Sequence, residues 1–485
     1  MGFESKKITE ESINHNQYGG GFIFKQVALY VGMFLLGCGI VFIGVKVYGL
    51  VGDKINLFGT HSTGSIQDEV DSLSNTKIVN ALIVGVGGEW HRGSYNTDTM
   101  IVASYNPRNK DVTMISIPRD LYVKIDEGYY GRINSILQYY LNSRSMSMTG
   151  AMEQLKTKVG DIIGQDITYY GLIDFKWFEH IIDTLGGVNV NVPETLIDPS
   201  FPIDNFNYGT LRINSGQQIM NGEKALSYAR SRHSTSDFDR SRRQQIIIKA
   251  VINKLLSLGS LSKIKPLYND FQATVTTNAG LNDIIKYLPV ISKLGEITTV
   301  VFQSDCPENL NQMQHGCVLY SPGREAFGGA AILLPMGATA KSVTNYTQLF
   351  RFVNRAIQYP FGDFNKIQLG IYNGIDKNLT TRNISGIGTK LGVELIRNGL
   401  NIQTVENNNI KHTNNMLILL TGGLLSSKQL AQYTALMQDV LNIGDIQIVG
   451  VDQLANNFSG TIETGVNMMF LVGSNAVATG TSITY

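Results

Sequence analysis

The chain has 485 residues, a formal net charge of +1 and 16% charged residues. That length allows about two to three domains with cores of their own, and the 43% hydrophobic content argues against a disordered chain. The near-neutral balance argues against a protein that binds nucleic acid through bulk positive charge, although it leaves room for a local anion site.

Residues 26–50 form the strongest break in composition, because residues 27–45 are apolar or glycine throughout. The run is long enough to cross the roughly 30 Å apolar core of a bilayer, and it is longer than the apolar part of a cleaved signal peptide. Lys6, Lys7 and Lys25 precede it and favour a cytoplasmic N-terminus. We therefore predict a cytoplasmic tail over 1–25, a transmembrane helix over 26–50 and an extracytoplasmic remainder.

The three cysteines fit this topology. Cys38 ends a Leu-Leu-Gly-Cys run that resembles a lipoprotein cleavage box, but the apolar run continues past it, so a cysteine within the membrane is preferred to lipidation. Cys306 and Cys317 lie close together in a polar segment, and an oxidising exterior would allow them to pair. Free thiols are the alternative, and no Cys-x-x-Cys or histidine cluster accompanies them to suggest zinc.

Residues 51–76 are rich in Ser, Gly and Asp and are predicted to form a stalk. Three apolar segments then predict strands, at 78–86, 99–104 and 112–117. Polar residues follow or precede each of them: Glu89 and His91 after the first, Asp98 before the second, and Arg119 after the third. The ends of strands are the usual place for a site on a sheet, so we expect these residues to lie near one.

Strands and helices alternate further along the chain. The apolar spacing predicts helices at 150–164, 175–185 and 244–258, and strands at 169–173 and 188–192. This alternation predicts an α/β fold.

Five arginines lie within fourteen residues in the middle of the chain: Arg230, Arg232, Arg240, Arg242 and Arg243. A guanidinium presents a planar fork of donors that fits phosphate oxygens, so the cluster predicts a strongly anionic ligand. The alternative is the start of a helix with a solvated basic face. Asp237 and Asp239 lie within the cluster, which suggests internal pairing or a role in metal binding or proton transfer.

Taken in order, these segments resemble the LytR-CpsA-Psr family of cell-wall glycopolymer ligases. The matching motifs are Asn-Thr-Asp-Thr-Met at 96–100, Ser-Ile-Pro-Arg-Asp at 116–120, Arg-Ile-Asn at 132–134, Asp-Thr-Leu-Gly-Gly-Val at 183–188, Asn-Gly-Glu-Lys-Ala-Leu-Ser-Tyr-Ala-Arg-Ser-Arg at 221–232, and the segment 237–245. The resemblance implies a catalytic domain over 77–360, built as a mixed β-sheet flanked by helices with a hydrophobic tunnel for a polyprenyl chain. Residues 361–485 look like the small α/β C-terminal domain attached to many members.

The resemblance also implies roles for residues. Those expected to surround a pyrophosphate are Arg119, Arg230, Arg232, Arg240, Arg243 and Gln244, whereas Arg242 falls outside the pattern. Arg119, Arg230, Arg232 and Asp237 are the expected catalytic residues, and Asp237 either holds an arginine or helps to deprotonate the acceptor.

Asp98 matches a carboxylate near a bound Mg²⁺ (or Mn²⁺), for which oxygen ligands are expected. Many members carry a second Asp where this chain has Gly87. Glu89 is the preferred substitute over His91, because imidazole suits softer metals.

The function implied is a membrane-anchored, extracytoplasmic phosphotransferase that moves a glycopolymer from a polyprenyl-pyrophosphate carrier to a wall acceptor, most simply peptidoglycan. One alternative is a wall- or lipid-binding protein without turnover. Another is a DNA-binding regulator, which the predicted topology disfavours because the domain would not reach the chromosome; no nucleic-acid partner is expected.

Overall fold

The computed structural model describes residues 77–88, 95–108, 110–202, 207–231, 237–257, 275–280, 283, 297–359, 364–376, 378 and 385–478. No helix within these ranges is long and apolar enough to span a bilayer. The predicted tail (1–25), transmembrane helix (26–50) and stalk (51–76) lie outside the described residues.

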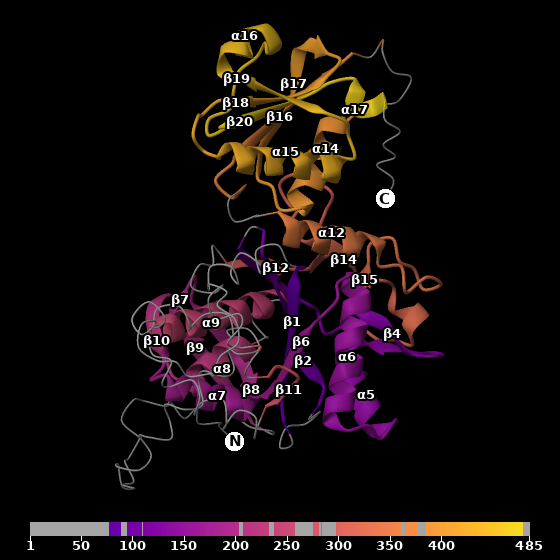
Figure 1. Ribbon diagram of the computed structural model, residues 1–485, viewed down its shortest axis with the longest axis vertical. Helices are drawn as coiled ribbons and strands as arrows, with labels where there is room; N and C mark the ends of the chain where they lie inside the picture. The colour runs from indigo at the N-terminus through magenta and orange to yellow at the C-terminus, as the bar shows by residue number, and fades with distance from the viewer. Residues whose placement is uncertain are drawn as a thin grey trace, which may run out of the picture.

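A six-stranded mixed sheet forms the centre of the first domain (Figure 1). The strand order is β11 (Thr276–Thr277), β6 (Tyr169–Asp174), β1 (Val79–Val86), β2 (Thr97–Asn106), β3 (Asp111–Ser116) and β12 (Ile297–Val301). β2 runs antiparallel to both β1 and β3, whereas β6 and β12 run parallel to β1 and β3. The inner strands are almost continuously buried because helices cover both faces of the sheet.

Two sets of helices cover the two faces of this sheet. One face packs on α5 (Ile136–Asn142), α6 (Met148–Ile163) and α12 (Thr347–Gln358). The other face packs on α7 (Phe175–Thr184), α8 (Gly222–Arg230) and α9 (Asp237–Ser257). Alternate residues of β1 serve the two cores: Leu82 and Val84 point to the first, and Ile83 points to the second.

Helices α7 and α8 approach each other very closely at Gly222. A Cβ atom at this position would lie 2.2 Å from the carbonyl oxygen of Glu179, so only glycine fits. The Gly222 N–H donates to Oδ1 of Asp183 at 2.7 Å, and the Asn221 side chain accepts from the Lys224 N–H to cap α8. The Asn-Gly-Glu motif therefore fixes where α8 starts, and with it the position of Arg230 at its end.

Several short strands lie outside the central sheet. They form the hairpins β4 (Tyr122–Asp126) with β5 (Tyr129–Arg132) and β8 (Leu196–Pro202) with β9 (Tyr208–Ile213), the pair β7 (Val188–Val192) with β10 (Gly216–Met220), and the sheet β13 (Gln303–Ser304), β14 (Cys317–Tyr320) and β15 (Leu334–Pro335). The β4–β5 hairpin leads through the 3₁₀ turn η1 (Ile133–Ser135) into α5.

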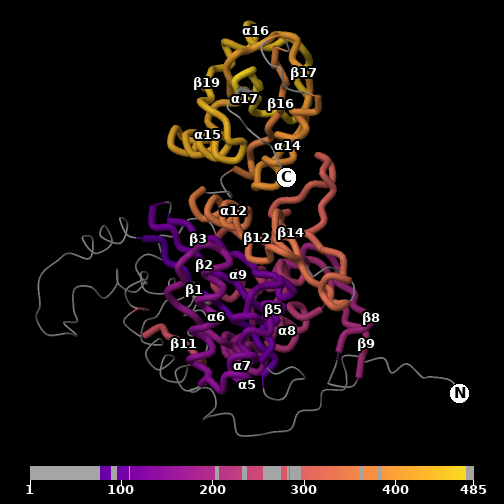
Figure 2. Tube along the Cα trace, turned by 90° about the vertical axis from the view of Figure 1, so that its right-hand side faces the viewer, coloured from indigo at the N-terminus to yellow at the C-terminus, as the bar shows by residue number. Residues whose placement is uncertain are grey.

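The C-terminal domain is a five-stranded sheet stacked on the end of the first domain, beyond α12 (Figure 2). Its strand order is β17 (Ile402–His412), β16 (Leu369–Ile375), β20 (Met468–Val472), β18 (Asn415–Leu419) and β19 (Ile446–Gly450). Helices α14 (Ile387–Arg397) and α15 (Ser427–Leu441) lie between this sheet and α12, and the short helices α16 (Leu454–Asn457) and α17 (Asn475–Ala478) lie at its far side and end.

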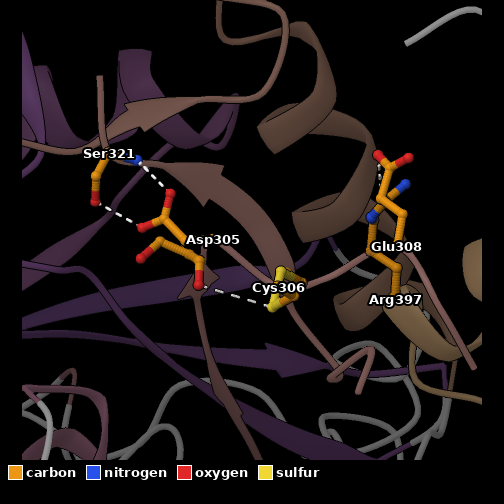
Figure 3. The surroundings of a disulfide bond; sticks show 7 residues. Asp305, Cys306, Glu308, Ser321 and Arg397 are labelled. Atoms are coloured by element: carbon orange, nitrogen blue, oxygen red, sulfur yellow. Dashed lines mark hydrogen bonds and ion pairs between the residues drawn. A yellow bond between two sulfur atoms is a disulfide. The ribbon is translucent and has the colours of Figure 1, made fainter. Parts of the chain in front are cut away.

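A disulfide joins Cys306 and Cys317, whose Cα atoms are 6.2 Å apart, beside the contact between the domains (Figure 3). The loop that it closes contacts α14: Oε1 of Glu308 lies 3.9 Å from Nη2 of Arg397, and the Gly316 N–H donates to the Arg397 carbonyl at 2.9 Å. On the other side, Asp305 accepts hydrogen bonds from the N–H and Oγ of Ser321. The closed loop therefore ties β14 to the C-terminal domain.

Candidate active site

A row of alternating charges lies where β2 begins and β3 ends. Nη1 of Arg119 donates to Oδ1 of Asp98 at 2.7 Å, and its Nε lies 3.6 Å from Oδ2 of Asp120. Oδ1 of Asp120 in turn accepts from Nη1 of Arg132 at 3.0 Å. Asp98 and Arg119 meet because β2 and β3 are antiparallel, so the start of one strand lies beside the end of the other.

Arg240 approaches the same point from α9. It is 4% exposed, and its Nη2 donates to the backbone carbonyl of Asp98 at 3.2 Å. Gln245, about one turn later, donates from Nε2 to Oγ of Ser116 at 2.9 Å and to the carbonyl of Val300 at 3.0 Å. These bonds hold the first turns of α9 across the strand ends that carry Asp98 and Arg119.

Arg230, the last residue of α8, completes the group. Its guanidinium carbon lies 4.5 Å from the centre of the Phe175 ring and 5.9 Å from that of Phe201. Burial lowers the pKa of Arg230, and the charges of Asp98 and Glu179 oppose that shift. Within the described residues it makes these ring and electrostatic contacts but no hydrogen bond, so its donors are available to an anion.

A narrow apolar cavity of about 60 Å³ opens beside Arg230, between the sheet and helices α7, α8 and α9. Most of its lining is apolar, and Arg230 and Gln244 are among the polar residues that line it. Pockets for small molecules measure about 300–1,000 Å³, so this cavity accommodates only the first carbons of a chain unless the helices separate. The slot lies on the face of the sheet that α7, α8 and α9 cover, and the hydrophobic tunnel expected from the resemblance stays a prediction.

The remaining arginines of the cluster have other partners. Arg243 is buried; its Nε donates to the Tyr228 carbonyl at 3.0 Å and its Nη2 to the Ser231 carbonyl, so its guanidinium holds the end of α8. Arg242 is exposed and pairs with Asp239 at 2.7 Å. Arg240 and Arg243 are three residues apart and share a helix face, whereas Arg242 points away.

Some predicted site residues are not part of the described structure. Arg232, Glu89 and His91 lie outside the described residues, and Asp237 begins α9 although its side chain is not described. Among the described residues no group of three or more His, Cys, Asp or Glu side chains is placed to hold a metal. Asp98 is the one predicted metal ligand among them, and it is paired with Arg119, so the residues described do not by themselves make a magnesium site.

The structure adds residues that sequence reasoning did not assign. Asp120 and Arg132 extend the row of charges, and both lie in segments that carry the family resemblance. Asp198 is completely buried, and it accepts a hydrogen bond from Oγ of Ser231 at 2.7 Å. Ser231 directly follows Arg230 in the chain. Nothing in the local pattern of β8 distinguishes this carboxylate from an exposed strand residue.

Comparison with known proteins gives one family and several relatives. A sequence model of the LytR_cpsA_psr family matches residues 53–327. The polyisoprenyl-teichoic acid–peptidoglycan teichoic acid transferase TagU of Bacillus licheniformis is 26% identical over 267 residues, which covers 54% of this chain and 80% of that protein. TagU of Bacillus subtilis is 28% identical over 250 residues, which covers 49% of this chain and 75% of that protein. The crystal structure of Bacillus subtilis TagV aligns at 24% identity and a TM-score of 0.43, covering 58% of this chain and 98% of that one.

Proposed function

The chain belongs to the LytR-CpsA-Psr family, and from this premise we propose that it transfers a glycopolymer from a polyprenyl-pyrophosphate carrier to a cell-wall acceptor. In the reaction, an acceptor sugar hydroxyl, which we assign to peptidoglycan, forms a bond to the phosphorus that carries the glycopolymer. The bond from that phosphorus to the bridging oxygen breaks, and polyprenyl phosphate leaves with the electron pair. The hydroxyl proton passes to a base, and the product is a phosphodiester.

The observation that carries this proposal is that Arg119 and Arg240 both donate to Asp98, while Arg230 lines an apolar slot together with Thr99, the next residue of β2. Negative charge grows on the leaving phosphate during transfer, and catalysis needs fixed cations where it grows. Arg230 is half-buried, and a partly buried cation attracts an anion more strongly than one that is fully in water. The apolar slot beside it suits the first carbons of a prenyl chain.

Two parts of the proposal involve Asp237 and Glu89, whose side chains lie outside the described part of the structure. Asp237 is the candidate base for the acceptor proton, because it begins the helix that carries Arg240. Asp98 together with Glu89 would hold Mg²⁺ or Mn²⁺, which would offset charge on the pyrophosphate.

The test uses the full chain in detergent with a lipid-linked glycopolymer donor and wall acceptor. Replacing Arg119 or Arg230 by Lys keeps a charge but loses the planar fork. We expect the transfer rate to fall roughly 100- to 1000-fold, the usual cost of one donor to developing charge, while the melting temperature changes little. Arg242→Lys, in the same stretch but exposed, is the matched control.

Transfer at the parent rate by both variants would refute the pyrophosphate assignment. If the parent protein binds the lipid donor but forms no phosphodiester, it is a binding protein without turnover.

We also propose that residues 26–50 anchor the chain in the cell membrane with the N-terminus in the cytoplasm, which confines the catalytic domain near its lipid substrate and raises the effective concentration. A cysteine introduced at Ser62 is then expected to react with a membrane-impermeant maleimide in intact cells. Labelling only after lysis would mean that the domain lies in the cytoplasm. A DNA-binding regulator would then again be a candidate function.

A further inference from the structure

An exposed aromatic surface lies on one face of the β4–β5 hairpin, and we call it the tyrosine shelf: Tyr122, Lys124, Tyr130, Arg132 and Phe327. Tyr130 is 42% exposed, and its ring lies nearly parallel to that of Tyr122, with centres 6.5 Å apart and planes 15° apart. Tyr122 in turn meets Phe327 edge to face at 5.1 Å. The shelf is therefore a supported aromatic surface and not a single loose side chain.

The pairing of the two strands places these residues on one face. Tyr122 lies opposite Arg132, and Lys124 lies opposite Tyr130. Residues directly opposite, and those two positions away on the same strand, share a face of a sheet. The intervening residues Val123 and Ile125 point the other way and are fully buried against α5 and α6.

The shelf is continuous with the candidate active site. Arg132, at one end of it, pairs with Asp120, which lies 3.6 Å from Arg119. The hairpin packs on the core that contains α5 and α6, whereas the slot beside Arg230 lies on the α7–α9 side of the sheet. In phosphoryl transfer the attacking and leaving oxygens lie roughly in line, so an acceptor approaches from the side away from the prenyl chain.

The chemistry of the shelf suits sugar rings better than an anion. Each of its two cations has an acidic partner, since Lys124 pairs with Glu127 at 2.8 Å and Arg132 pairs with Asp120 at 3.0 Å, so the shelf carries no excess of positive charge. Beside these ion pairs lies the 42% exposed ring of Tyr130, which Tyr122 supports, with charged hydrogen-bonding groups at its margin. Such a surface takes the C–H face of a pyranose on the rings and its hydroxyls on the margin.

We propose that the tyrosine shelf binds sugar rings of the acceptor glycan and presents its hydroxyl to the phosphorus held near Arg119. This inference rests on the proposed transferase function, because it names the part of the site that holds the second substrate. Tyr130 then helps to select the acceptor glycan, whereas Arg119 and Arg230 bind the phosphate groups of the donor.

The experiment measures binding of a soluble β-1,4-linked N-acetylglucosamine tetrasaccharide to the full chain in detergent, without donor. Tyr130→Ala is expected to weaken binding about 3- to 10-fold, the range for one aromatic contact, and to raise the acceptor KM by a similar factor with kcat nearly unchanged. Tyr130→Phe keeps the ring and is expected to bind like the parent. Tyr208→Ala, the same change at a 67% exposed tyrosine of the β8–β9 hairpin, is the matched control.

Equal affinity and equal acceptor KM for the parent and Tyr130→Ala would overturn the shelf while leaving the transferase proposal intact. Tetrasaccharide binding that depends on Tyr130, in a protein that performs no transfer, would support the shelf and reject turnover. The two proposals therefore fail in distinguishable ways.

Discussion

The arginines of one short stretch have different surroundings, and their surroundings decide what each can do. Arg230 is packed against aromatic rings, and Arg240 donates to the backbone of Asp98. Arg243 is directed at two backbone carbonyls, and Arg242 is in solvent. The composition of the stretch predicts an anion site. It does not show which arginines are buried: the helical register of α9 turns Arg240 and Arg243 inward and Arg242 into solvent.

The surroundings of Arg243 predict a stability effect and not a direct effect on phosphate binding. Arg243→Ala leaves the buried carbonyls of Tyr228 and Ser231 without their donor, and each unpaired buried acceptor costs about 1–3 kcal/mol. We expect a loss of roughly 2–6 kcal/mol in the free energy of unfolding, measured by urea denaturation of the full chain. Arg242→Ala, one residue earlier, should stay within about 0.5 kcal/mol of the parent.

Binding of a polyprenyl pyrophosphate, measured well below the unfolding transition, should remain within a few-fold of the parent in Arg243→Ala. Parent-like stability combined with lost lipid binding would return Arg243 to the pyrophosphate site.

At the scale of elements, the sequence predicts β1, β2, β3 and β6 of the central sheet to within about two residues, but it does not predict the edge strands β11 and β12. Helices cover both faces of β1, β3 and β6, and the apolar segments within these strands differ clearly from the loops around them. β2 starts two residues before the predicted strand, so that Asp98 lies within it. Its polar start looks like a loop because the site occupies that end.

Helix α9 starts earlier than its apolar pattern predicts. Its apolar stripe begins near Ile246, so the sequence predicts a start at residue 244, whereas the helix starts at Asp237. Arg240 and Arg243 are buried through hydrogen bonds to backbone carbonyls, and a hydrophobic pattern counts such residues as exposed.

The β4–β5 hairpin was not predicted, although its sequence carries the pattern of one. Val123 and Ile125 alternate with polar residues, and Glu127-Gly128 provides the turn, with Gly128 at φ +69°. The pairing of Arg132 with Asp120 was not detectable, because it depends on how the hairpin folds back toward β3.

At the scale of the whole molecule, the two domains share a core. The cluster that begins with Leu82 in β1 and Leu155 in α6 continues through Leu349 and Phe352 of α12 to Leu436 of α15. α12 therefore belongs to the packing of both domains. Domains joined by a hydrophobic contact of this kind are expected to move together, whereas polar contacts would leave them free to move independently.

Arg355 is the polar anchor of this junction and provides its test. It is 9% exposed on α12, and its Nε and Nη2 donate to Oδ2 and the carbonyl of Asp439 at 2.6 and 2.8 Å, while its Nη1 donates to Oδ1 of Asn398 at 3.1 Å. Arg355→Met keeps the apolar stem but leaves these acceptors at the ends of α15 and α14 without a donor. The Asp439 side chain is 53% exposed, so water replaces part of the lost hydrogen bonding. We therefore expect the contact between the domains to lose roughly 1–3 kcal/mol of stabilising free energy.

That loss should weaken the contact between the domains more than either core. We expect hydrogen exchange in α15 to accelerate by about 5- to 100-fold in Arg355→Met, while exchange in β1 stays as in the parent. Arg351→Met, an exposed arginine one turn earlier on α12, is the matched control and should change neither. Equal acceleration in α15 and β1 would mean that the chain opens as a single unit, and unchanged exchange in both would mean that the shared apolar core alone holds the domains together.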